Sequence, residues 1–276
     1  MHFDGAGYSD AGRVRTINQD SFLVKIAQTA IGEIVLVAVA DGMGGQERGE
    51  FASATAIYAL ANWFDSDLPI ELAAPRANDA ELDQKIDAQL VRFARSLNAQ
   101  LVSYGRQERV SSGTTLTAFL AIGSQYWILH VGDSRAYEIT EASIVQLTDD
   151  QTYVKREVDA GRLTPEEALV HPRRNVLLQC LGVTDDVWPV VVRGSLKPQA
   201  SYLLCSDGFR HVLTQDELQQ GLRLSVVDAY GRRSGCASRP DAIAGVLHEM
   251  TELVKDRKED DNITAVLVCC LPDGFL

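Results

Sequence analysis

Apolar residues alternate with polar ones along some stretches of this chain and recur every three or four positions along others. Strand-like segments are expected near 20–27 and 33–40, and helical segments near 47–64 and 81–104. Between the two helical segments, residues 65–79 carry two prolines and several acids and predict an exposed loop. The second helical segment has an apolar stripe that predicts packing on a flat apolar surface: Leu82, Ile86, Leu90, Phe93, Leu97, Leu101 and Tyr104.

The second half of the chain has the pattern of further strands with one polar interruption. From 114 to 147, β-branched and aromatic pieces separated by tight turns predict antiparallel strands. Residues 148–180 then become polar and helical, and Thr164, Pro165 and Glu167 have the spacing of a capping box. We interpret this segment as an excursion from the sheet. The remaining elements are expected as strands near 188–195, 200–206 and 263–271 and a helix starting near Pro240.

Composition narrows the class of protein. With 276 residues and 46% hydrophobic content the chain can bury a large core, and we expect one domain over residues 1–276. A net charge of -12 argues against binding nucleic acid, which needs clustered Lys and Arg. The amino terminus lacks a basic stretch followed by an apolar one, and no apolar run approaches the ~18 residues that span a bilayer. We therefore expect a soluble, cytoplasmic monomer with no membrane or nucleic-acid partner.

The cysteines point away from cysteine chemistry. The chain has 5 of them and no CxxC spacing, which disfavours a disulfide framework and a zinc knuckle. Cys205 stands one residue too close to Arg210 for the signature of phosphatases with a nucleophilic cysteine. We expect most of these thiols to be buried and reduced.

Four aspartates stand at the ends of strand-like segments, namely Asp20, Asp41, Asp207 and Asp261. If the fold brings them together, two carboxylates ~4 Å apart repel by about 4 kcal/mol at an effective dielectric constant near 20. A cation is then needed to neutralise them. Oxygen-only ligands favour Mg²⁺ or Mn²⁺ over zinc, which recruits His or Cys.

Residues next to these acids extend the hypothesis. Gly42 lets the backbone turn sharply after Asp41, so its carbonyl can face the same ion. A binuclear oxygen site of this kind activates a bridging water as hydroxide for in-line attack on phosphorus. Arg13 and Arg15, just upstream of Asp20, are candidates for holding the other phosphate oxygens. Either arginine could instead be a solvated surface residue.

An ordered series of short motifs carries a resemblance to a known family. The motifs are Ser9-Asp10-x-Gly12-x-x-Arg15-x-x-Asn18-Gln19-Asp20, Asp41-Gly42-Met43-Gly44-Gly45, Gly113-Thr114-Thr115, Gly132-Asp133-Ser134-Arg135, Ser206-Asp207-Gly208 and Asp261-Asn262. In that order they resemble the metal-dependent Ser/Thr protein phosphatases of type 2C, the PPM family, especially its bacterial members. Each motif alone is weak, but the series covers nearly the whole chain.

The resemblance implies an α+β fold, an α-β-β-α four-layer sandwich of two mainly antiparallel sheets flanked by helices, with metal ions in a cleft at one end. It implies two Mn²⁺ or Mg²⁺ ions and a third, weaker site, and it makes Arg15 the group that binds the substrate phosphate. The ligands it implies are Asp41, Asp207 and Asp261 for one ion, Asp41, the Gly42 carbonyl and water held by Asp20 for the other, and Asp133 with Asp207 for the third.

Residues 148–180 resemble the flap of this family, a mobile subdomain beside the cleft that affects substrate choice. His171 in the flap is a candidate substrate contact, because an imidazole titrates near neutrality, or else a polar surface residue. Three positions depart from the family's pattern. Met43 stands where many eukaryotic members have a proton-donating histidine, which leaves the general acid unassigned, and Gln19 is neutral where they have an acid. Leu178-Gln179-Cys180 replaces the usual Thr-Arg-Ala, which puts the flap contacts in doubt.

The implied function is a metal-dependent protein Ser/Thr phosphatase that hydrolyses phosphoserine and phosphothreonine by attack of a metal-bridging hydroxide. Its partners would be phosphorylated proteins, and it would oppose a bacterial Ser/Thr kinase. Two alternatives stay open. A catalytically silent domain of this family could bind phosphoproteins, although intact Asp41, Asp207 and Asp261 argue against it. A hydrolase of small phosphate esters or diesters could use the same metals, and comparing phosphopeptide with small-molecule turnover separates it.

Overall fold

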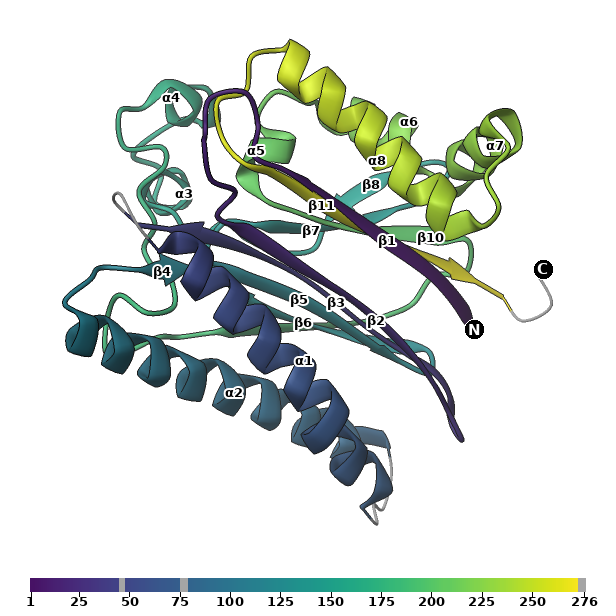
Figure 1. The fold of residues 1–276 in the computed structure, drawn as a ribbon, viewed down its shortest axis with the longest axis horizontal. Coiled ribbons are helices and arrows are strands. Elements are labelled where there is room, and N and C mark those ends of the chain that lie inside the picture. Colours follow the sequence, from purple (N-terminus) through teal and green to yellow (C-terminus); the bar gives the residue numbers. More distant parts are fainter. Residues whose placement is uncertain (45–47, 75–78, 273–276) are drawn as a thin grey trace.

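Two antiparallel β-sheets lie face to face in this protein, and helices cover the outer face of each sheet (Figure 1). The structure is a computed structural model that describes residues 1–44, 48–74 and 79–272. The layers follow one another as helices, sheet, sheet and helices. The α+β sandwich expected from the sequence is therefore confirmed.

The first sheet carries the two longest helices on its outer face. Its strands run in the order β2 (Asp20–Thr29), β3 (Gly32–Met43), β5 (Leu116–Ile122), β6 (Gln125–Val131) and β9 (Val190–Ser195), and the short β4 (Gly113–Thr114) pairs with the end of β3. The helices that cover it are α1 (Gly49–Ala73) and α2 (Asp79–Glu108). The apolar stripe predicted in the second helical segment lies on the inner face of α2, where Ile86 and Leu90 are at most 1% exposed.

The second sheet is covered by the C-terminal helices. Its strands run in the order β1 (His2–Asp10), β11 (Ile263–Leu271), β10 (Ala200–Cys205), β7 (Arg135–Ile139) and β8 (Ile144–Gln146). The helices on its outer face are α5 (Asp207–Arg210), α6 (Gln215–Leu222), α7 (Leu224–Ser234) and α8 (Arg239–Asp256). Two further helices, α3 (Tyr153–Asp159) and α4 (Pro165–Val170), lie outside the layers at one end of the sandwich, in the segment predicted as the flap (Figure 1).

Strand β3 shows why the first sheet is buried on both faces. Residues 34–40 are each at most 2% exposed, and the pleat sends successive side chains to opposite faces. Leu36 packs into the core under α1 and α2, whereas Val37 packs into the core between the two sheets. A third core lies between the second sheet and its helices. The unbroken apolar run of β3 follows from this two-sided burial, and Asp41 stands where the run ends.

Elements with strong local signals match the prediction. Strand β11 covers the predicted range 263–271. Helix α4 has the predicted capping box, in which the Thr164 hydroxyl accepts from the Glu167 N–H and Glu167 Oε2 accepts from the Thr164 N–H. No disulfide forms among the described cysteines, and Cys205, Cys269 and Cys270 are buried.

The prediction of an exposed loop over 65–79 is wrong for residues 65–73, because α1 continues through Pro69 and ends at Ala73. Residues 75–78 lie outside the described residues. A proline inside a helix removes a hydrogen bond and costs about 3 kcal/mol. Here the same turns bury Phe64 and Leu68, which is 1% exposed, against the sheet. Burial of a side chain of this size contributes about 1.5–3 kcal/mol, so tertiary packing outweighs the local signal.

The sequence pattern also leaves β1, α6 and α7 unpredicted. Two glycines dilute the alternation of β1, and a Cβ on Gly7 would lie 2.5 Å from the Phe22 ring, so glycine makes room there for the facing sheet. The start of α6 does carry a signal, because Thr214 and Glu217 form a capping box like that of α4. Among the described helices, none combines the length and apolar character that crossing a bilayer requires.

Candidate metal centre and active-site cleft

Two aspartates face each other across neighbouring strands of the first sheet. Asp20 opens β2, Asp41 lies near the end of β3, and the antiparallel register pairs them directly. Asp20 is 8% exposed, and its carboxylate accepts a hydrogen bond from Ser206 Oγ at 2.9 Å. The N–H of Asp41 donates to Thr115 Oγ1 at 2.9 Å. Strand pairing therefore places two carboxylates at the same end of the sheet.

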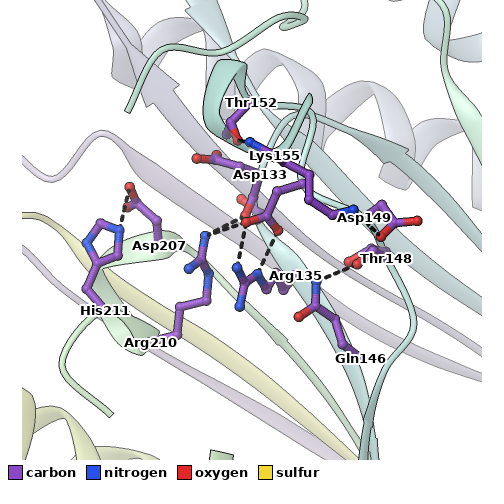
Figure 2. A network of polar contacts seen from close by, with 12 residues as sticks. Asp133, Arg135, Gln146, Thr148, Asp149, Thr152, Lys155, Asp207, Arg210 and His211 are labelled. Carbon is purple, nitrogen blue, oxygen red and sulfur yellow. Dashed lines mark hydrogen bonds and ion pairs between the residues drawn. The ribbon is translucent and has the colours of Figure 1, made fainter. Parts of the chain in front are cut away.

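The second sheet brings further aspartates to this end of the sandwich. Strands β10 and β11 are antiparallel neighbours, so Asp207, just after β10, and Asp261, just before β11, lie at the same edge. Asp133 occupies the turn from β6 in the first sheet to β7 in the second. Asp133 and Asp207 lie near each other in Figure 2. The fold thus brings together the aspartates that were predicted from the sequence as site residues.

Burial and the charges of neighbouring aspartates raise the pKa values of three of these acids, Asp20, Asp41 and Asp133. Burial first, and then the charges of Asp207 and Asp261, raise the pKa of Asp20 to about 7. Burial and the charges of all four other aspartates raise the pKa of Asp41 well above its usual range. Burial and the charge of Asp207 raise the pKa of Asp133 to about 7. Full ionisation at neutral pH therefore requires a compensating cation.

The donor set fits a hard divalent cation. In the described parts of the chain, no three His, Cys, Asp or Glu side chains are close enough to enclose one ion as they stand. Mg²⁺ usually keeps several waters and takes only one or two carboxylates from the protein, so a tight cage is not required. The buried groups that repel one another are all carboxylates. They suit Mn²⁺ or Mg²⁺ better than zinc.

Gly42 has a different role in the backbone from the one expected. The chain does not turn sharply at Gly42, because β3 continues to Met43. A Cβ on Gly42 would lie 2.2 Å from the carbonyl oxygen of Gly49 and 2.4 Å from that of Gln19. Only glycine fits this close approach between β3, the loop before β2 and the first turn of α1. Gly44 is the last described residue of the motif, and Gly45 lies outside the described residues.

The loop between β1 and β2 presents Arg15 to the cleft. Its side chain is 51% exposed, and its guanidinium donates to Asp261 Oδ2 at 3.1 Å. Arg13 instead donates to the carbonyl of Lys255. The buried amide of Asn262 holds the loop, donating to the carbonyls of Ala11 and Ile17 at 3.0 and 3.1 Å. Asn262 stands in one of the motifs of the sequence but had no role assigned there. Its place beside Asp261 was the available signal.

A cleft of about 740 Å³ joins two of the site aspartates to the flap segment, whereas Asp20, Asp41 and Asp207 are not among its described lining residues. It is lined by Arg15, Asp133 and Asp261 from the body of the protein and by residues of α3 and α4, Leu169 among them. His171 is not among the described residues that line it. Its Nδ1 accepts from the Arg173 N–H at 3.0 Å, and its ring packs on Tyr153 at 5.7 Å between centroids.

The atypical residue Gln179 ties the end of the flap segment to the body. Its side chain donates to the carbonyl of Trp188 at 3.3 Å and accepts from the Trp188 N–H at 2.7 Å. Burial raises the pKa of the neighbouring Cys180 thiol to about 11, with a smaller contribution from Asp133. That thiol is therefore protonated at neutral pH and unsuited to nucleophilic attack.

The sandwich brings acids from the ends of both sheets together beside an exposed arginine. This arrangement is typical of proteins that use divalent cations to act on an anionic substrate. Residues 9–248 match the model of the family described as Protein phosphatase 2C, and the chain belongs to this family. The chain is 34% identical over 262 residues to the serine/threonine protein phosphatase PstP of Mycobacterium tuberculosis, a match that covers 95% of this chain and 44% of PstP. It thus spans less than half the length of that curated relative.

Solved structures agree with this assignment. A bacterial serine phosphatase has a TM-score of 0.78 and 26% identity, and the match covers 99% of both chains. The catalytic domain of PstP in complex with 2 manganese ions has a TM-score of 0.74 and 30% identity, covering 98% of this chain and 99% of that one. The family resemblance read from the motifs is confirmed.

Proposed function

We propose that this chain is a metal-dependent protein phosphatase that hydrolyses phosphoserine and phosphothreonine in proteins. The observation that carries the proposal is the convergence of five aspartates beside Arg15, three of which (Asp20, Asp41 and Asp133) have pKa values raised by burial and by the charges of their neighbours. Membership of the Protein phosphatase 2C family supports it, as do relatives named serine/threonine protein phosphatases.

The site residues take the roles that the resemblance implies. Asp41, Asp207 and Asp261 would hold one ion, Asp41, the Gly42 carbonyl and water held by Asp20 the other, and Asp133 with Asp207 a weaker third. Mn²⁺ or Mg²⁺ bound there would lower the pKa of water for in-line attack on phosphorus and stabilise the charge on the phosphoryl oxygens. Asp20 needs no direct contact, because Ser206 fixes its carboxylate at the edge of the site.

Arg15 would bind the phosphate of the substrate. A guanidinium presents two parallel N–H donors that match two phosphate oxygens. Its present partner, Asp261, orients it over the cleft at 3.1 Å. Half of the side chain is exposed to solvent, so a phosphorylated residue entering the cleft can reach it without unfolding the loop.

The segment 148–180 would contact the protein around the phosphorylated residue, since α3 and α4 line the same cleft. We treat residues 1–276 as one catalytic domain. A Ser/Thr kinase that the chain opposes, a monomeric state and a cytoplasmic location stay predictions.

The deciding experiment measures phosphate release from a phosphothreonine peptide by the purified protein with Mn²⁺ and with EDTA. The Asp207→Asn variant serves as the control for contaminating phosphatases. Turnover that needs both Mn²⁺ and Asp207 is expected. If Mn²⁺ binds by calorimetry but neither the peptide nor p-nitrophenyl phosphate is hydrolysed, the protein is a silent binding domain. If only p-nitrophenyl phosphate is hydrolysed, it is a small-ester hydrolase.

A further inference from the structure

The first residues of the flap segment are fixed to the turn that carries Asp133. The N–H of Gln151 donates to the carbonyl of Gly132, and the N–H of Gly132 donates back to Gln151 Oε1, both at 2.8 Å. Close by, His130 Nε2 lies 3.0 Å from the carbonyl oxygen of Asp149. This part of the flap is therefore tied to the β6–β7 turn.

Asp150, between these contacts, is shared by two arginines. Arg135 holds it with two hydrogen bonds of 2.6 Å, from Nε to Oδ1 and from Nη2 to Oδ2. Arg210 Nη2 reaches the same Oδ2 at 3.5 Å. The side chains of Asp150 and Arg210 are only 13% and 11% exposed. Two largely buried guanidiniums thus share one carboxylate, which leaves one positive charge in excess.

The guanidinium of Arg210 lies close to the aspartates of the candidate metal site. Its Nη2 also donates to the backbone carbonyl of Asp133 at 3.1 Å. Arg210 is the last residue of α5, the single turn that begins with Asp207. One guanidinium therefore joins three parts of the protein: the turn of Asp133, the helix of Asp207 and the start of the flap at Asp150.

We propose that Arg210 is a positioning residue that fixes Asp133 and Asp207 relative to each other and to the flap. Arg210 would not touch the substrate. Its loss would leave the Arg135–Asp150 pair in place but free α5 from the β6–β7 turn. This inference rests on the proposed function where the test measures kcat and KM. The second measurement, the affinity for Mn²⁺, does not depend on catalysis.

The test compares Arg210→Gln with Arg257→Gln. Arg257 is a matched control on the same outer layer, because it also bonds a carbonyl, that of Val212, and a carboxylate, that of Glu217. Neither of these partners belongs to the turn of Asp133 or to the flap. For each protein, kcat and KM are measured on p-nitrophenyl phosphate and on a phosphothreonine peptide at saturating Mn²⁺. Calorimetry measures the Kd for Mn²⁺ alone.

We expect Arg210→Gln to lower kcat about 10- to 100-fold on both substrates with KM nearly unchanged, and to weaken Mn²⁺ binding by a similar factor, as loss of an outer contact at a metal site does. Arg257→Gln should lower Tm without changing kcat or the Kd. If the Arg210→Gln variant kept the kcat and Kd of the parent, the proposal would be overturned and Arg210 would be a purely structural residue.

Arg210→Lys keeps the test decisive if the glutamine variant does not fold. Lysine retains the buried charge but lacks the planar fork that reaches Asp150 and the Asp133 carbonyl together. We expect kcat to fall at least about threefold, and parental kcat and Kd in this variant would overturn the proposal. If the parent hydrolyses neither substrate, the proposed function fails, and the Mn²⁺ affinities still decide the role of Arg210.

Discussion

Replacing Asp20 by Asn should stabilise the metal-free protein at neutral pH. The pKa of Asp20 is raised from 3.8 to about 7, first because the carboxyl is buried and then because Asp207 and Asp261 repel it. A pKa that is higher in the folded than in the unfolded state means that the folded protein binds more protons between those two values. Stability therefore falls as pH rises through this window, and above it the whole penalty is present.

The structure sets the size of the effect. A rise of the Asp20 pKa from 3.8 to about 7 corresponds to about 4 kcal/mol in the free energy of unfolding. Because neighbouring acids share protons with Asp20, we expect a difference on the order of 2 kcal/mol. Asparagine has nearly the same shape, and its Oδ1 can accept the hydrogen bond that Ser206 donates to Asp20. At about 2–4 °C per kcal/mol for a chain of this size, we expect Tm to rise by about 4–8 °C.

The assay is thermal unfolding in EDTA at about pH 7.5 and about pH 5. At the lower pH, inside the window, Asp20 is protonated in the folded parent but ionised in the unfolded chain, so only part of the penalty is present and the difference in Tm should be smaller than at about pH 7.5. Asp67→Asn, on an exposed position of α1, is the control and should leave Tm unchanged. Saturating Mn²⁺ should narrow or reverse the difference, because the parent binds the cation better. A variant no more stable than the parent at neutral pH in EDTA would refute the repulsion argument.

Three further substitutions test other parts of the structure. Arg15→Ala should raise KM for a phosphopeptide about tenfold or more with a smaller change in kcat, and an unchanged KM would contradict the phosphate-binding role. Asp133→Ala should leave two Mn²⁺ ions bound by calorimetry but slow turnover, whereas parental kcat would make Asp133 a simple turn residue. Leu36→Ala, at a position 0% exposed, should lower the free energy of unfolding by about 2–5 kcal/mol in urea titrations.

The parts of the fold that the sequence predicts are those with a local signal. Helix α4 is marked at its start by Thr164 and Glu167, and α2 shows its inner face through a regular apolar stripe. Pro69 misleads for the opposite reason, since the burial that keeps α1 helical comes from contacts with a distant sheet. The apolar run that ends at Asp41 predicted a strand correctly, because a strand that is buried on both faces appears in the sequence as a continuous apolar run.

The acids of the site were predictable, and the contacts that hold them were not. An aspartate at the end of an apolar run is visible in the sequence. The bond from Ser206 to Asp20 joins residues 186 positions apart, and the bond from Arg210 to Asp150 spans 60 positions. Such contacts depend on how two sheets pack, which no local pattern encodes. Arg210 in particular could not be distinguished from a surface arginine before the fold was known.

The origin of the acids in two different sheets links the cleft to the stability of the sandwich. Asp20 and Asp41 come from the first sheet, whereas Asp207 and Asp261 come from the second. Their repulsion opposes closure of the sheets at this end, and the packing of the three cores has to offset it. A cation held by ligands from both sheets has no such site in the unfolded chain, so at 100 times its Kd it would add about 2.7 kcal/mol to the free energy of unfolding. The same acids that destabilise the metal-free protein would then link its two sheets through the cation. The protein should therefore be most stable when the cation is bound in the cleft.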